Sequence, residues 1–80
     1  MDIKKIDKFA RTVTYTHQRT IVKMKNGKEH VGFFDKNTTT LNSMKSNKWN
    51  FNDFHFENEG EKLIELNGDD IVSIEIKSLI

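Results

Sequence analysis

The sequence predicts a mainly β protein, a small antiparallel sheet preceded by a short N-terminal helix. Two segments carry most of this prediction, residues 21–34 and 63–76, because each places Asn-Gly between runs rich in β-forming residues. Asn-Gly is the strongest short hairpin signal, since both residues tolerate a positive φ. The third observation is an apolar stripe with helical spacing at the start of the chain.

Length and composition limit the class of protein. Eighty residues suffice for one domain whose core only marginally offsets chain entropy, so oligomerisation would add stability. The absence of cysteine excludes disulfides, thiolate metal sites and a cysteine nucleophile. No apolar run has the length of a signal peptide or a membrane span. We therefore expect a soluble, cytoplasmic protein that makes no membrane contact.

A short amphipathic helix is expected over residues 1–11. Ile3, Ile6, Phe9 and Ala10 recur at helical spacing, and Asp2 is placed to act as the N-cap. The apolar stripe would cover an open end of the sheet. Residues 11–17 then alternate threonines with Val13 and Tyr15, which predicts a half-buried strand with those two side chains in the core.

The first Asn-Gly segment permits two hairpin registers. A two-residue turn would place Lys25 opposite Lys28, whereas a three-residue loop with Gly27 as a bulge places Lys23 opposite Glu29 and residue 21 opposite residue 31. Opposite charges across a ladder are favourable and like charges are not, so we prefer the bulged loop. Gly32 in the return strand indicates a sharp bend or a close backbone approach.

The middle of the chain changes character twice. Residues 36–47 are polar and predict a loop, with a short strand around Leu41. Residues 48–57 are rich in aromatics, and a tight turn at Asn52-Asp53 would bring four of them onto one surface: Trp49, Phe51, Phe54 and Phe56. That surface is a stacking platform for bases, a subunit interface or part of the core.

The last third predicts further strands. Residues 58–61 are a turn or a bend within a long strand, and residues 62–66 are extended. Beyond Asn67-Gly68, the alternation of Val72, Ile74 and Ile76 predicts a core strand with these three side chains on one face.

Charge divides the chain in two. Residues 1–50 hold eleven Lys/Arg against four Asp/Glu, a net +7, and residues 51–80 hold two against eight, a net −6. A basic half is the electrostatic footprint of nucleic-acid binding. Alternatively, acidic strands lie beside basic ones in the fold and the charges pair or stay solvated.

Both Asn-Gly segments resemble the two motifs of the Sm-like family. The first motif, a turn followed by a strand with a glycine and a later apolar-Asn step, is similar to Asn26-Gly27, Gly32 and Leu41-Asn42. The second, Leu-Arg-Gly before an apolar strand, is similar to residues 66–74. The resemblance implies a strongly bent, SH3-like barrel of five strands over residues 12–80. It also implies rings in which the fourth strand pairs with the next subunit's fifth, and RNA binding at the inner rim.

The family's RNA pocket uses an Asp, a stacking side chain and an Asn from the first motif, and the Arg of the second. Asn42 and Gly68 match this pattern. Thr38, Thr40 and Asn67 stand where the Asp, the stacking residue and the Arg would be, and remain candidates by position alone. Turn chemistry alone would also account for Asn67 and Gly68.

No catalytic pattern accompanies these motifs. The three histidines have no His-x-x-x-His spacing, Asp69-Asp70 lacks EF-hand spacing, and there is no glycine-rich phosphate loop or nucleophile elbow. We therefore expect a protein that is not an enzyme and that needs no metal or cofactor.

Two functional hypotheses remain. The first is an Sm-like, ring-forming homo-oligomer that binds RNA through its basic first half, with six lysines as phosphate contacts: Lys4, Lys5, Lys8, Lys23, Lys25 and Lys28. The second is a protein-interaction or assembly module that buries the aromatic face around Trp49 against a protein partner.

Overall fold

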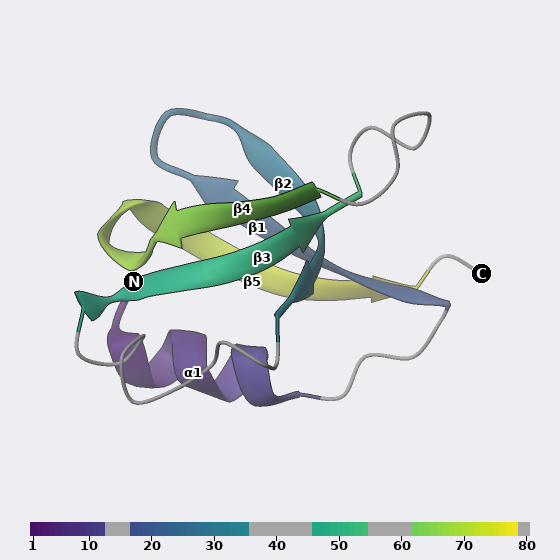
Figure 1. The fold of residues 1–80 in the computed structure, drawn as a ribbon, viewed down its shortest axis with the longest axis horizontal. Helices are drawn as coiled ribbons and strands as arrows, with labels where there is room; N and C mark the ends of the chain where they lie inside the picture. Colours follow the sequence, from purple (N-terminus) through teal and green to yellow (C-terminus); the bar gives the residue numbers. More distant parts are fainter. Residues whose placement is uncertain (13–16, 36–45, 55–61, 79–80) are drawn as a thin grey trace.

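The computed structural model describes residues 1–12, 17–35, 46–54 and 62–78. Along the chain, one helix precedes five strands, with a 3-10 helix before the last of them (Figure 1). The elements are α1 (Ile3–Arg11), β1 (Gln18–Met24), β2 (Glu29–Phe34), β3 (Lys48–Asp53), β4 (Lys62–Asn67), η1 (Gly68–Asp70) and β5 (Ile71–Ser78).

The five strands form one antiparallel sheet in the order β4-β3-β2-β1-β5. The predicted fold class, a mainly β chain of five antiparallel strands with one N-terminal helix, is therefore confirmed. The sheet is not closed in the described residues, since β4 pairs only with β3 and β5 only with β1. Consequently β4 and β5 are its two edges. Helix α1 lies against one side of the sheet (Figure 1).

Helix α1 packs as its sequence pattern predicts. Ile6 and Ala10 are buried in the core, and Ile3 and Phe9 pack partly buried against it. Asp2 occupies the N-cap position, but its side chain makes no capping hydrogen bond. A nine-residue helix is marginal alone in water, so the apolar stripe supplies most of its stability.

The first hairpin has the bulged register that charge pairing favours. Ile21 pairs with Val31 and Lys23 with Glu29. Met24 accepts a hydrogen bond from the Gly27 amide and donates one to the Lys28 carbonyl, which closes a three-residue loop. Gly27 has a φ of 87°, a conformation that glycine adopts at little steric cost.

Gly32 marks a close backbone approach, as predicted. A Cβ at this position would overlap the backbone carbonyl oxygen of Asn52 on β3. The strand β2 can therefore lie against β3 at this point only without a side chain at residue 32.

The second Asn-Gly segment is not a hairpin. The strands on either side of it, β4 and β5, lie at opposite edges of the sheet, and η1 connects them. The Asn67 side-chain oxygen accepts a hydrogen bond from the Asp69 amide, which starts the 3-10 turn. The same dipeptide that closes a hairpin in the first segment therefore turns a corner here, because β4 finds its partner in β3 and β5 finds its partner in β1.

The predicted alternation in the last strand is wrong at Val72. Ile71 and Ile74 are buried, whereas Val72 is 56% exposed. The register explains this, since Lys23 pairs with Ser73 but Met24 pairs with Ile71. The extra residue is a β-bulge, which moves Val72 out of the core face.

The N-terminal strand prediction also needs correction. Arg11 ends α1 and Thr12 is its C-cap, so neither residue belongs to a strand. The first strand begins at Gln18 instead. Val13 and Tyr15, and the loop of residues 36–45 with Leu41, lie outside the described residues, as do residues 55–61.

The core lies between α1 and the inner face of the sheet. It comprises nine buried apolar residues: Ile6, Ala10, Val22, Phe34, Trp49, Phe51, Leu66, Ile71 and Ile74. Phe34 is central among the aromatics, with edge-to-face contacts to Trp49 and Phe51 at centroid distances of 6.3 and 5.2 Å. Such pairs add to the free energy of area burial.

Candidate functional site

The aromatic face predicted around Trp49 does not form. Residues 48–53 are one continuous strand, so there is no turn at Asn52-Asp53. Trp49 and Phe51 point inward and are buried in the core. Phe54 lies on the opposite face of the sheet, and Phe56 lies outside the described residues. Of the three alternatives for these aromatics, the structure therefore places Trp49 and Phe51 in the core.

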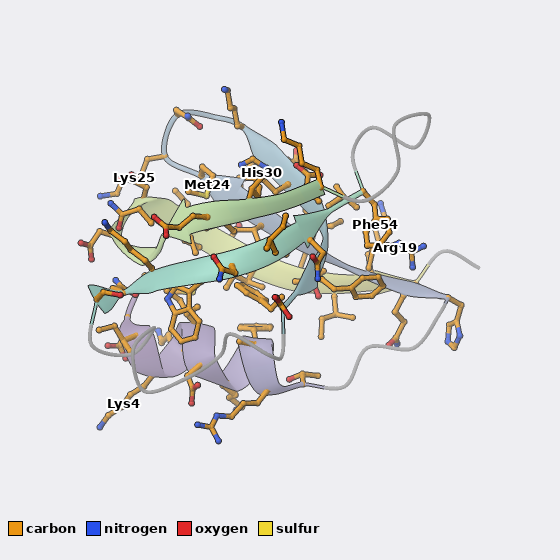
Figure 2. The ribbon with its side chains drawn as sticks, viewed as in Figure 1. Lys4, Arg19, Met24, Lys25, His30 and Phe54 are labelled. Atoms are coloured by element: carbon orange, nitrogen blue, oxygen red, sulfur yellow. The ribbon has the colours of Figure 1, made fainter. Side chains whose placement is uncertain are left out.

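Three of the six candidate lysines share the exposed side of α1. Lys4, Lys5 and Lys8 are exposed, and Lys4 extends away from the sheet in Figure 2. The neighbouring Arg11 forms an ion pair with Asp7, with 2.9 Å between Nε and Oδ2. The helix thus presents a cationic strip.

The other three lysines lie at the β1–β2 hairpin, among acidic groups. Lys23, Lys25 and Lys28 are exposed, but Lys23 pairs across the ladder with Glu29. The Lys25 amide donates to the Asp70 carbonyl at 2.8 Å, so the hairpin tip lies against the acidic η1. Here the acidic half of the chain neighbours the basic half, as the second interpretation of the charge pattern expects.

The motif residues divide into those with a structural role and those outside the described residues. Asn67 is exposed and caps η1. Gly68 is buried: its amide donates to the Asn47 carbonyl at 2.7 Å, and its carbonyl accepts from the Met1 amine at 2.9 Å. A Cβ on Gly68 would overlap the Asn47 side chain. The structure does not describe Thr38, Thr40 and Asn42.

Asn47 is a buried polar residue that sequence reasoning missed. Its side-chain oxygen accepts from the Trp49 indole N–H at 3.0 Å, and its Nδ2 donates to Asp69 Oδ1 at 2.9 Å. It has a φ of 54°, which asparagine tolerates better than most residues. Asn47 thus connects the start of β3 to η1. A lone asparagine before a strand is no signal for this role.

A second missed pair joins β2 and β3. His30 Nδ1 lies 3.2 Å from Asp53 Oδ2, and both side chains are mostly buried. The register makes them diagonal neighbours, because Gly32 pairs with Asp53. The described residues contain no group of three or more His, Cys, Asp or Glu arranged to hold a metal ion.

The outward face of the sheet carries a cation–aromatic cluster that we name the Arg19 cluster: Arg19, Phe33 and Phe54. The guanidinium carbon lies 4.9 Å from the Phe33 centroid and 5.3 Å from the Phe54 centroid. The two rings meet edge to face at 5.3 Å. Figure 2 shows Arg19 and Phe54 side by side. The hairpin register was the available signal, because pairing Thr20 with Gly32 puts Arg19 opposite Phe33.

A hollow of about 260 Å³ opens beside this cluster. It lies where the C-terminal end of α1 meets β1, β2 and β3. Its lining includes Phe9, Thr12, Thr20, Phe33 and Asn52. Phe33 and Asn52 are direct cross-strand partners, so their side chains share a face. The hollow therefore combines aromatic rings with hydroxyl and amide residues.

Two general findings concern the described part of the chain. None of its helices has both the length and the apolar composition of a membrane span. Within the same residues, every buried side-chain nitrogen and oxygen has a hydrogen-bond partner. No unsatisfied buried polar atom there indicates a missing ligand.

Comparisons with known proteins leave the family open. No family model, no curated protein and no solved structure matches this chain. The functional argument therefore depends on the chain's own residues and their geometry.

Proposed function

We propose that this chain is a non-enzymatic, Sm-like module that assembles with copies of itself through its edge strands and binds RNA along α1. The support is threefold: the position of β4 and β5 in the sheet, the apolar side chains on those strands, and the cationic strip on the helix.

The observation that carries the proposal is the location of the exposed apolar side chains. In the described residues, the two large ones are Leu63, 55% exposed, and Val72, 56% exposed. Leu63 is on β4 and Val72 on β5, the two edge strands. An edge strand offers unpaired backbone groups to another chain, and an apolar side chain on it adds burial to that pairing.

The charges on the two edges suit a contact between unlike edges. β4 carries Lys62 and Glu65, and β5 carries Glu75 and Lys77, all exposed. Each edge therefore has one cation and one anion within a few residues, so neither edge repels the other by net charge. Pairing of β4 with a neighbour's β5 is also the ring contact that the resemblance to Sm-like proteins implies.

RNA contact is better supported on α1 than at the hairpin. Lys4, Lys5 and Lys8 share a helix whose nearby Asp7 is already paired with Arg11. The hairpin lysines instead have Glu29 and η1 beside them. Phosphates gain most from cations that no carboxylate neutralises, so the helix supplies the electrostatic affinity.

The assembly step is tested by light scattering during size-exclusion chromatography. We expect the wild-type protein to elute as a closed oligomer and Val72→Glu to elute as a smaller species. Val72→Thr is the matched control, because it keeps a β-branched side chain of similar shape and should stay assembled. A monomeric wild type, or an oligomer unaffected by Val72→Glu, would contradict assembly through the edges.

The RNA step is tested by fluorescence anisotropy with single-stranded RNA at several salt concentrations. Replacing the three helix lysines by Gln should weaken binding and flatten the dependence of log K on log salt, by roughly 0.7 per lost phosphate contact. The matched control replaces Lys23, Lys25 and Lys28 by Gln, which removes the same charge. Equal effects of both triple variants would show that net charge, not the helix, determines binding.

A further inference from the structure

We propose that the hollow beside the Arg19 cluster receives one nucleobase of a single-stranded RNA, with the guanidinium of Arg19 at its sugar–phosphate. This inference rests on the proposed RNA function and names the site at which a base is held. The site shares no residue with the motif positions Thr38, Thr40, Asn42, Asn67 and Gly68.

The size and lining of the hollow indicate a single ring system. Its volume of about 260 Å³ lies just below the roughly 300 to 1,000 Å³ of pockets for drug-sized ligands. Phe9 and Phe33 supply aromatic surface, and a base stacks on such rings. Asn52 brings a side-chain amide, which has both donors and an acceptor for the edge of a base.

The Arg19 cluster adds the charge that a nucleotide requires. The guanidinium lies over Phe33, the same ring that lines the hollow. A guanidinium is planar and permanently cationic, so it contacts phosphate and also stacks with aromatic groups. An uncharged apolar ligand would gain nothing from this cation.

The helix connects this site to the proposed phosphate contacts. Phe9 and Thr12, at the C-terminal end of α1, line the hollow. Lys8, the last of the three helix lysines, immediately precedes Phe9. An RNA backbone that follows the exposed side of α1 therefore reaches the hollow at the end of the helix. This charge complementarity favours RNA over a protein segment as the occupant.

The test measures RNA affinity and mononucleotide binding with the same variants. In anisotropy measurements, Phe33→Leu and Asn52→Ala should each weaken binding of single-stranded RNA by about tenfold, because one stacked and hydrogen-bonded base is lost. Arg19→Lys keeps the charge and should still weaken binding, whereas the surface control Lys28→Gln should have little effect. The fluorescence of the single tryptophan, Trp49, reports whether each variant is folded.

NMR titration with AMP and UMP separates failure of this site from failure of the RNA function. We expect amide shifts at residues 9, 12, 33 and 52 with both nucleotides. RNA binding without shifts at the hollow, or with unchanged affinity in folded Phe33→Leu and Asn52→Ala, overturns the site and leaves the RNA function. Mononucleotide shifts at the hollow without RNA binding support the site and contradict the RNA function. Absence of both overturns the two together, as does occupation of the hollow by a copurified protein.

Discussion

The indole N–H of Trp49 donates to the side-chain oxygen of Asn47 at 3.0 Å, inside the protein. The amide nitrogen of the same Asn47 side chain donates to Asp69, so one buried residue holds the first residues of β3 against η1. A tryptophan N–H in a core needs such a partner, since an unpaired buried donor costs about 1 to 3 kcal/mol.

Asn47→Gly should lower the free energy of unfolding by about 1 to 3 kcal/mol. Glycine tolerates the positive φ, so the loss reports the two side-chain hydrogen bonds. Asn67→Gly is the control, because an exposed N-cap asparagine replaced by glycine loses only a few tenths of a kcal/mol. Urea unfolding followed by Trp49 fluorescence, at one protein concentration, compares the two. Equal losses would refute the role of Asn47.

Gly68→Ala should destabilise the protein by about 1 to 3 kcal/mol through overpacking, because the new Cβ overlaps the Asn47 side chain. In an Asn47→Gly background the same change should cost clearly less. A double-mutant cycle of unfolding free energies measures this coupling. Additive losses would mean that Gly68 is required for another reason, such as a ligand contact.

Gly32→Ala should prevent stable folding, since its Cβ meets a backbone oxygen of β3 that cannot rotate away. Gly27→Ala has open space around its Cβ and only the positive φ to oppose it, which costs roughly 1 to 2 kcal/mol. Circular dichroism melts of both variants should therefore differ widely. A folded Gly32→Ala protein of wild-type stability would show that β2 does not approach β3 this closely.

The hairpin register predicts a charge-swap rescue between Lys23 and Glu29, which pair directly. Lys23→Glu should raise the energy of the ladder by roughly 0.2 to 1 kcal/mol, and adding Glu29→Lys should restore most of it. Thermal unfolding at low salt is the measurement. If the double variant is no more stable than Lys23→Glu alone, the two residues do not face each other.

The bulge in β5 predicts unequal effects at adjacent positions. Ile71→Ala should cost about 2 to 5 kcal/mol because the side chain is buried, whereas Val72→Ala should change the stability of the folded subunit little. Urea unfolding of both variants, at a protein concentration where the chain is monomeric, provides the comparison. The reverse order would restore the simple alternation of Val72, Ile74 and Ile76.

Sequence patterns of short range predicted their structures well. The helical spacing of Ile3, Ile6, Phe9 and Ala10 determines which side of α1 is buried, and this depends only on residues within three turns. The pairing of Lys23 with Glu29 follows from a loop whose chemistry is local to Asn26 and Gly27. Gly32 predicts a close approach because a glycine inside a strand usually marks a bend or a backbone contact.

Only the tertiary structure decided which strands become neighbours, and most of the candidate site depends on that choice. Asn67-Gly68 has the same local chemistry as Asn26-Gly27, yet it turns a corner because β4 and β5 pair elsewhere. Trp49 enters the core and Phe33 joins Arg19 on the outward face because β3 pairs on both sides and cannot turn back at Asn52. Pairing energy and core burial are properties of residues distant along the chain, so a local pattern carries no record of them.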